Sequence, residues 1–199
     1  MEFIRKQNIK NSLAPKRVLI IYGPRRVGKT TLLKKYLSTC LNKKILYVVG
    51  DDFLIRELFK KEILKELLDF ARPYEIIAID EAQQIPSIGL GIKMIIDAFP
   101  EKQIILTGSS SFDLASKIGE PLTGRHFTMT LFPITQIEIN MSRFELKNNL
   151  NNFLIYGSYP EILSTENPVE KERILNELIS SYLYKDVLAL DKIKMPDLL

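Results

Sequence analysis

The sequence predicts an α/β fold, a three-layer α/β/α sandwich in which helices cover both faces of a parallel sheet. Two observations carry this prediction. Five short apolar segments are expected to be strands: Val18–Tyr22, Ile45–Val49, Ile76–Asp80, Ile104–Leu106 and His126–Phe132. Helical segments separate them, and strands that alternate with helices favour a parallel sheet buried on both faces.

The helices between the strands follow from apolar residues three and four positions apart. After the first strand these residues are Leu32, Leu33, Tyr36, Leu37, Cys40 and Leu41. After the second strand they are Leu54, Leu58, Leu64, Leu67 and Leu68. Asp51 or Asp52 is placed to cap that second helix, and Arg72-Pro73 ends it. A further helix is expected from Ser87 to Phe99, and another closes at Gly119.

The composition is that of a folded domain with a mildly basic surface. The 199 residues fit one domain, or one domain with a small appendage, and 46% hydrophobic residues suffice for a core. A formal net charge of +4 admits an acidic partner such as DNA without requiring one. Residues 1–16 lack the apolar core of a signal peptide, and no apolar run approaches membrane-spanning length. We therefore expect a cytoplasmic protein without a membrane partner. The dispersed basic residues of 1–17 predict a solvated lead-in, with nucleic-acid binding as the alternative.

A glycine-bounded loop follows the first strand. Gly23, four residues, and then Gly28, Lys29 and Thr30 form the Walker A pattern. The glycines let backbone N–H groups converge on a phosphate, towards which the next helix also directs its positive dipole end. A glycine-rich turn without a ligand is the plainer alternative. The candidate nucleotide-binding residues are Gly23, Pro24, Arg25, Arg26, Val27, Gly28, Lys29, Thr30 and Thr31.

The third strand ends in Asp80-Glu81, which is typical of a Walker B motif. A carboxylate at the tip of a strand beside the phosphate loop can hold Mg²⁺, so Asp80 and Thr30 are the candidate metal residues. Glu81 is placed to polarise an attacking water. The alternative role for this acidic pair is to cap a helix.

From residue 134 onward the sequence predicts helices. Thr135 with Glu138 forms a capping box, and Phe144–Tyr156 has helical spacing closed by Gly157. An amphipathic segment then runs from Val169 to about Leu190. We therefore divide the chain into a core at 1–133 and a helical subdomain at 134–199, which is either a lid or an interface.

These residues support a resemblance to a known family. The motifs Gly-Pro-Arg-Arg-Val-Gly-Lys-Thr-Thr (23–31), Ile-Ile-Ala-Ile-Asp-Glu-Ala-Gln (76–83), Leu-Thr-Gly-Ser-Ser-Ser (106–111), Leu-Thr-Gly-Arg (122–125) and Tyr-Gly-Ser-Tyr-Pro-Glu (156–161) occur in this order. They resemble the prokaryotic AAA-like P-loop ATPases related to the STAND class. The resemblance implies a sheet in the order 5-1-4-3-2, a helical lid, and ATP hydrolysis with Mg²⁺. It also implies that winged-helix and restriction-endonuclease-like domains usually follow, so the chain is expected to be truncated.

The resemblance suggests further roles. Ser109 fits the polar sensor of water or γ-phosphate, with Thr107 and Ser110 as neighbours, although Ser110 and Asp113 also form a capping box. Arg125 occupies the place of an arginine finger that reaches a neighbouring subunit, which would make a homo-oligomer, although an ordinary exposed arginine also fits. Arg143 and Arg173 are candidates for a second sensor. His126 is more simply a strand residue.

The sequence thus favours an ATPase that binds ATP or ADP with Mg²⁺ and is coupled to DNA or to a regulatory protein. Glu81 would activate water, Lys29 would stabilise charge on the phosphates, and Arg125 and Ser109 would complete the site. The alternative is a switch that binds nucleotide and hydrolyses it slowly or not at all. A small-molecule kinase is a third reading, against which Glu81 argues because it favours water over an acceptor hydroxyl.

Overall fold

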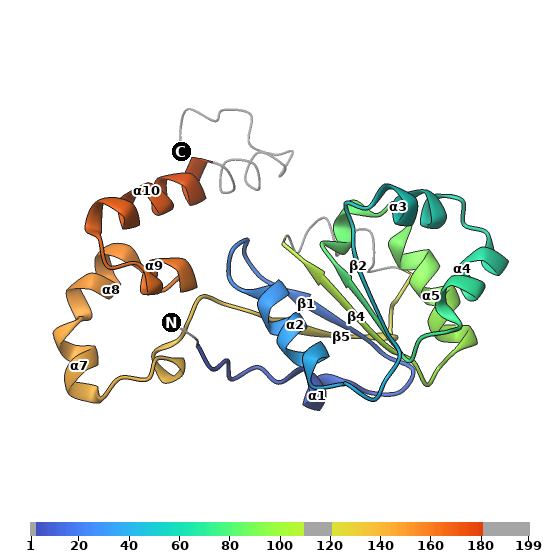
Figure 1. The fold of residues 1–199 in the computed structure, drawn as a ribbon, viewed down its shortest axis with the longest axis horizontal. Coiled ribbons are helices and arrows are strands. Elements are labelled where there is room, and N and C mark those ends of the chain that lie inside the picture. The colour runs from blue at the N-terminus through green and yellow to red at the C-terminus, as the bar shows by residue number, and fades with distance from the viewer. Residues whose placement is uncertain (1–2, 110–120, 181–199) are drawn as a thin grey trace. The chain divides into compact units, whose positions relative to one another are not determined.

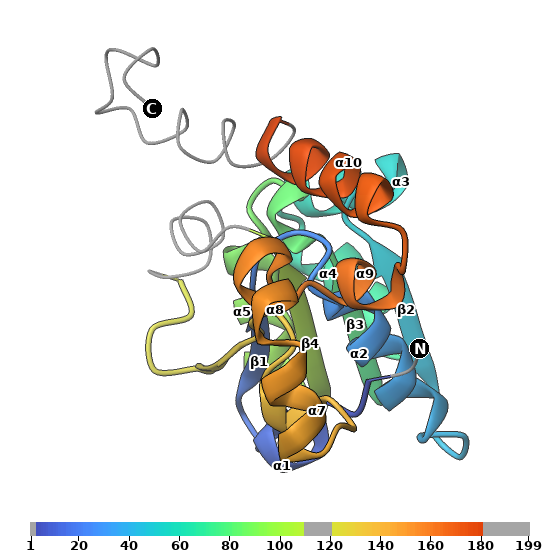
Figure 2. The ribbon, with the colours of Figure 1, turned by 90° about the vertical axis from the view of Figure 1, so that its left-hand side faces the viewer.

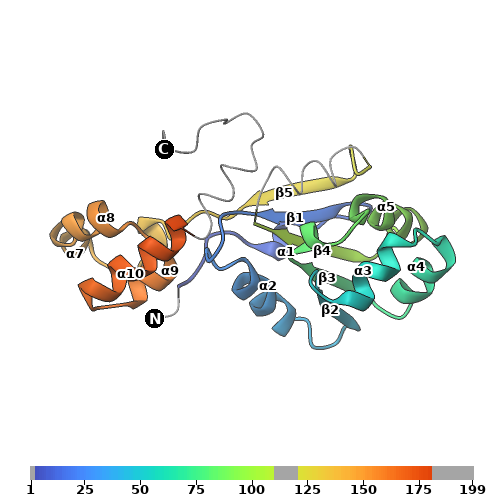
Figure 3. The same ribbon diagram turned by 90° about the horizontal axis from the view of Figure 1, so that it is seen from above.

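The computed structural model describes residues 3–109 and 121–180. Within them, five strands form one sheet: β1 (Val18–Tyr22), β2 (Ile45–Val49), β3 (Ile76–Asp80), β4 (Gln103–Gly108) and β5 (His126–Thr130). All neighbouring strands pair in parallel, in the order β2-β3-β4-β1-β5 that Figure 3 shows from one edge to the other. The predicted fold class and strand order are confirmed.

The register of the strands brings their carboxyl ends to one edge of the sheet. Tyr22 of β1 pairs with Gly108 of β4, and Val49 of β2 pairs with Asp80 of β3. In open parallel sheets, ligands bind outside this edge. The loop after β1 and the acidic end of β3 therefore lie at the same side of the sheet.

Helices cover both faces of the sheet. These are α1 (Ile9–Ser12), α2 (Lys29–Ser38), α3 (Phe53–Lys60), α4 (Leu64–Ala71) and α5 (Ile88–Ala98). Helices α3, α4 and α5 lie together (Figure 1) and share one buried cluster with alternate residues of β1, β3 and β4. Leu33 and Leu37 of α2 are buried outside that cluster, and α2 contacts β4 from the opposite face. Because side chains alternate along a strand, each face of the sheet has its own apolar layer.

One predicted helix of the sheet region is divided in the structure. The helix expected through Leu54 and Leu68 is two helices, α3 and α4, separated at Glu62, whose φ is 54°. This break exposes 74% of Leu54 and 51% of Leu64, both expected in the core. Of the predicted leucines Leu67 is fully buried, and Ile55, Phe59 and Ala71 are the other buried residues of this region. Of the two candidate caps, Asp52 is the one that accepts bonds from the first turn of α3.

Other helices match their expected limits more closely. Helix α5 has Ser87 and Phe99 at its two caps, as predicted. Helix α2 ends at Ser38, earlier than expected, and leaves Leu41 86% exposed. The helix predicted to close at Gly119 and the capping box at 110–113 lie outside the described residues.

The described residues form two compact units. The first, which we call the sheet unit, contains residues 6–24, 28–109 and 121–132. The second, the helical unit, contains residues 3–5, 25–27 and 133–180. Its helices are η2 (Gln136–Glu138), α7 (Arg143–Asn148), α8 (Leu150–Tyr156), α9 (Pro160–Ser164) and α10 (Pro168–Leu178), of which α7 to α10 are orange to red in Figure 2. In the part of the chain that the structure describes, no helix is both long enough and apolar enough to span a membrane.

The helical unit has a small core. Ile162, Ile174 and Leu178 are buried in it, with three partly buried residues around them. The predicted Phe144–Tyr156 helix is two helices, α7 and α8, and Gly157 closes the second with a φ of 73°. The later part of the predicted amphipathic segment lies outside the described residues.

Polar contacts fix the first residues of this unit. The predicted capping box of Thr135 and Glu138 is present at η2. Glu138 also pairs with Arg5, whose side chain is only 9% exposed. The expectation that the lead-in is solvated is therefore wrong for Arg5, because its guanidinium has a buried carboxylate partner from a distant part of the sequence. Burial lowers the pKa of Arg5, and the charge of Glu138 opposes this shift.

Candidate functional site

The loop between β1 and α2 closes around Lys29. The Lys29 Nζ atom donates to the carbonyl oxygens of Gly23 and Pro24, both at 2.8 Å, and the side chain is almost fully buried. Gly28 precedes α2 with a φ of 97°, a conformation that L side chains rarely adopt. No side chain caps the first turn of α2. Its N–H groups and the Lys29 ammonium form the kind of cradle that binds phosphate.

The hydroxyl of Thr30 joins this loop to the end of β3. Its Oγ1 atom donates to Oδ2 of Asp80 at 2.7 Å, and the Tyr47 hydroxyl donates to the same oxygen at 3.1 Å. Thr107 donates to the other carboxylate oxygen, Oδ1. Burial raises the pKa of Tyr47 to about 12, aided by the charge of Asp80 and by this hydrogen bond. The buried Asp80 is therefore held by three hydroxyl donors from β2, β4 and α2.

Glu81 follows Asp80 in an unusual backbone conformation. Its φ is 53°, and its N–H donates to Oγ1 of Thr107 at 3.1 Å. Gly50 lies against this turn, and its N–H donates to the Asp80 carbonyl at 2.7 Å. A Cβ atom at position 50 would lie 2.2 Å from the carbonyl oxygen of Glu81. The close approach of Gly50 and the bond to Thr107 together fix the direction in which Glu81 leaves the sheet.

The side chain of Glu81 has a partner in the turn that follows. Gln83 lies in the short 3₁₀ helix η1 (Ala82–Gln84), and its Nε2 atom donates to Oε2 of Glu81. The same nitrogen donates to Oγ of Ser109 at 3.2 Å. Gln83 and Ser109 are both buried. One amide therefore connects the acidic end of β3 with the residue that follows β4.

The structure brings most of the predicted catalytic and metal residues together. The carboxyl edge of the sheet carries five of them: Lys29, Thr30, Asp80, Glu81 and Ser109. Thr31 is exposed on the first turn of α2. Thr107, a neighbour in the predicted sensor segment, is fully buried and bonds to Asp80.

Arg125 lies elsewhere. It precedes β5 at the amino end of β1, where its carbonyl accepts from Val18, and its Nε atom pairs with Asp97 at 2.8 Å. It is thus at the opposite edge of the sheet from Lys29, and its predicted role towards a neighbouring subunit remains a prediction.

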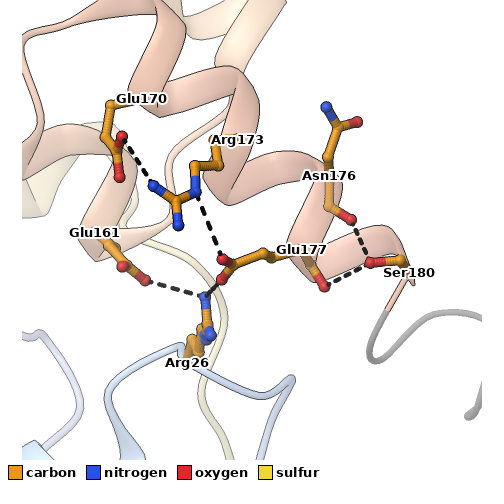
Figure 4. A network of polar contacts seen from close by, with 7 residues as sticks. All are labelled: Arg26, Glu161, Glu170, Arg173, Asn176, Glu177 and Ser180. Carbon is orange, nitrogen blue, oxygen red and sulfur yellow. Dashed lines mark hydrogen bonds and ion pairs between the residues drawn. The ribbon is translucent and has the colours of Figure 1, made fainter.

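The middle of the loop, residues 25–27, belongs to the helical unit. Arg26 has a φ of 59° and pairs with Glu177 of α10 at 3.0 Å and with Glu161 of α9 at 3.6 Å (Figure 4). Arg173, a candidate second sensor, extends the same network (Figure 4) through Glu170 and Glu177.

The backbone of residues 25–27 also accepts a hydrogen bond from Arg5. The Arg5 guanidinium donates to the Val27 carbonyl at 3.3 Å and to Glu138 at 3.2 Å. The other candidate second sensor, Arg143, is the first residue of α7.

The residues that sequence reasoning missed are Tyr47, Gly50 and Gln83. Tyr47 is a tyrosine in an apolar strand, and only the neighbouring position of β2 and β3 brings its hydroxyl to Asp80. Gly50 follows that strand directly, so a glycine at the end of a strand was the available signal. Gln83 closes the motif at 76–83 that supports the family resemblance, but nothing in its spacing from Glu81 predicts its bond to Ser109.

The donor atoms fit magnesium rather than zinc. Thr30 and Asp80 offer hard oxygen ligands in contact with each other. Among residues 3–109 and 121–180, no three His, Cys, Asp or Glu side chains gather as a metal cluster. Magnesium characteristically takes one or two protein ligands and completes its shell with phosphate oxygens and water.

Comparisons with known proteins agree with this geometry. Residues 15–140 match the model of a family described as AAA domain. The chain is 27% identical over 197 residues to an uncharacterized protein of Methanocaldococcus jannaschii, covering 91% of this chain and 44% of that protein. It is 23% identical over 188 residues to an uncharacterized protein of Haemophilus influenzae, covering 85% of this chain and 46% of that protein. It thus spans less than half the length of either relative. Because the family model covers more than half of the chain and includes both the phosphate loop and the end of β3, the chain belongs to the AAA domain family of P-loop ATPases.

Proposed function

We propose that the chain binds ATP with Mg²⁺ and hydrolyses the bond between the β- and γ-phosphates of ATP. The observation that carries this proposal is the 2.7 Å hydrogen bond between Thr30 and Asp80, residues that lie fifty positions apart in the sequence. It joins the hydroxyl of the Walker A motif to the carboxylate of the Walker B motif, the two protein groups that hold Mg²⁺ in P-loop NTPases. Bound magnesium would supply positive charge against the phosphate oxygens.

Lys29 and the first turn of α2 would bind the phosphates. The Lys29 ammonium already lies inside the loop, where it bonds to the carbonyls of Gly23 and Pro24. A phosphate oxygen carries a full charge and competes with these neutral acceptors for the same protons, because charge-assisted hydrogen bonds are the stronger ones. Lys29 then opposes the charge that develops during phosphoryl transfer.

Glu81 would orient the attacking water and accept its proton. Its backbone is fixed by Thr107 and by the close approach of Gly50, so its side chain starts from a defined position where β3 ends. Ser109 lies within the same network and can donate its hydroxyl proton to a phosphate oxygen or to the water. This arrangement favours water over an organic hydroxyl as the nucleophile, and hence hydrolysis over a kinase reaction.

The test is turnover compared with binding in two variants. Glu81→Gln should keep ATP affinity within about twofold and lower kcat by at least about a hundredfold, because an amide cannot accept the proton. Lys29→Ala should abolish measurable ATP binding in calorimetry. The matched controls are the exposed residues Glu101→Gln and Lys35→Ala, which should leave both quantities unchanged. An active Glu81→Gln enzyme, or unchanged affinity in Lys29→Ala, would refute the proposed roles.

A nucleotide-controlled switch is the second candidate, and the contacts of Arg26 favour it. The loop segment that includes Arg26 forms one compact unit with α9 and α10, to which it is joined by ion pairs. A ligand bound at the loop can therefore change the stability of these helices. In that case ATP and ADP would bind with turnover close to the uncatalysed rate.

We also propose that turnover depends on binding to another molecule, either a second copy of the chain, duplex DNA or a regulatory protein domain. An Arg125 that completes a neighbouring subunit's site would make the specific rate rise with protein concentration. Duplex DNA and a regulatory protein domain are the other partners. ATPase rates over a range of protein concentrations, with and without duplex DNA, distinguish these arrangements, and Arg125→Ala should remove only the concentration dependence.

A further inference from the structure

Gln83 has no role in the site described so far, yet it contacts two of its residues. Its side chain is 6% exposed, and its Nε2 atom donates to Oε2 of Glu81 and to Oγ of Ser109. Its neighbour Gln84 in the same 3₁₀ helix is exposed. A buried amide that bonds to the candidate base and to the candidate sensor differs from a glutamine that only fills space.

The chemistry of the two acceptors fixes how this amide is used. An ionised carboxylate can only accept hydrogen bonds, so the NH₂ end of Gln83 faces Glu81. The same NH₂ group has a second proton, which it donates to Ser109. Both protons of one rigid planar group are therefore used, and the distance between the Glu81 carboxylate and the Ser109 hydroxyl is set by that group.

Each contact has a consequence for the acceptor. Because Ser109 Oγ accepts from Gln83, the hydroxyl proton of Ser109 is directed away from Gln83 and is available to another acceptor. Because Oε2 of Glu81 is held by Gln83, the carboxylate cannot rotate freely. Oε1 is then the oxygen that is available to a water proton.

We infer that Gln83 is a positioning residue for hydrolysis, which holds the Glu81 carboxylate and the Ser109 hydroxyl in one fixed relation. This inference rests on the proposed function of Glu81. Thr107 and Gly50 fix the main chain of Glu81. Gln83 fixes its side chain, which the main-chain contacts leave free to rotate.

The experiment compares Gln83→Met with Gln84→Met in the complete chain. Methionine has about the length of glutamine and fills the buried space, but it cannot donate. Gln83→Met should lower kcat about tenfold, the effect of losing a hydrogen bond to a charged group, and should keep the calorimetric affinity for ATP within about twofold. Gln84→Met should match the wild type in both measurements.

A double-mutant cycle with Ser109→Ala provides the second readout. If Gln83 acts partly through Ser109, the loss of kcat in the double variant should be smaller than the product of the two single losses. In a Glu81→Gln background, Gln83→Met should lower kcat by a smaller factor than it does in the wild type. Independent, multiplicative effects in both cycles would overturn the inference.

The outcomes also separate this inference from the proposed function. Wild-type turnover in Gln83→Met would refute the positioning role and leave Glu81 as the base. Equal losses of ATP affinity and kcat would mean that Gln83 only supports the fold. A wild-type chain that binds ATP without hydrolysing it would refute the proposed function and this inference together.

Discussion

Different interactions stabilise the sheet unit and the helical unit, each within itself. In the sheet unit the five residues of β3 are all buried, and helices α3 to α5 share one apolar cluster with the strands. In the helical unit neither α7 nor α8 has a buried residue. Phe144, Leu154 and Ile155 on these two helices are each at least 65% exposed. Apolar burial stabilises the first unit, and caps and ion pairs contribute more to the second.

This difference explains where the candidate chemistry lies. Asp80 and Thr107 lie within the buried strands β3 and β4, and Glu81 directly follows β3, so their geometry has the stability of the core. Segments with little buried apolar surface open at lower free energy and are suited to movement. The loop residues 25–27, which belong to the helical unit, are therefore the part of the phosphate loop expected to respond to changes in α9 and α10.

The largest expected effect tests this contrast with one residue type. Ile77 in β3 is completely buried, whereas Ile155 in α8 is 65% exposed. Ile77→Ala removes a side chain from the centre of the cluster and should lower the free energy of unfolding by about 4 kcal/mol. Ile155→Ala should change it by about 0.5 kcal/mol or less. Urea unfolding followed by circular dichroism measures both.

The result can also contradict the comparison. Equal losses in the two variants would mean that the surface of α8 is covered in solution and that the two units do not differ in burial. A small loss in Ile77→Ala would mean that the sheet relaxes around the missing side chain.

A smaller effect is expected at the buried ion pair of the helical unit. Glu138 is 1% exposed in its side chain, pairs with Arg5 at 3.2 Å and accepts two bonds from Thr135. Glu138→Gln keeps the shape and leaves the guanidinium without its counter-charge, at a cost of about 3 kcal/mol. Hydrogen exchange should show reduced protection in η2 and its neighbours, with β3 and β4 unchanged.

The control for this change is Glu170→Gln, on an exposed pair with Arg173. It should leave exchange in η2 as it is in the wild type. Loss of protection in β3 and β4 of Glu138→Gln would show that the two units unfold together.

The sequence could predict the strands because their signal is local. A strand buried on both faces is apolar along its buried length, and residues 18–21 and 76–79 show this. The helices were harder to predict because a helical pattern continues across a break. Leu54 and Leu64 keep the spacing of a single amphipathic helix, but the positive φ of Glu62 turns the chain between them.

The candidate site also has one part that the sequence predicts and another that it does not. The Walker A spacing is local, so the loop around Lys29 could be placed from the sequence. Contacts made through the strand order could not, because Tyr47 and Thr107 reach Asp80 from separate strands. The Gln83 bond to Ser109 also depends on which strand lies beside β3, since no pattern within either segment predicts it.

The smallest expected effect is at Arg26, where the comparison can be sharpened. Its pairs with Glu161 and Glu177 involve side chains that are 34%, 49% and 46% exposed. Such pairs contribute roughly 0–1 kcal/mol and weaken as salt screens them. Arg26→Gln should therefore lower the stability of α10 by about 0.5 kcal/mol in 0.05 M salt, with the difference from wild type nearly absent at about 1 M. Hydrogen exchange of α10 measures the change, and the matched control is Arg173→Gln, which removes one pair to Glu177 and one to Glu170. A loss of several kcal/mol that persists in high salt would show that Arg26 is a structural anchor of the helical unit, and that apolar burial and exposed charge do not divide the molecule as its two units suggest.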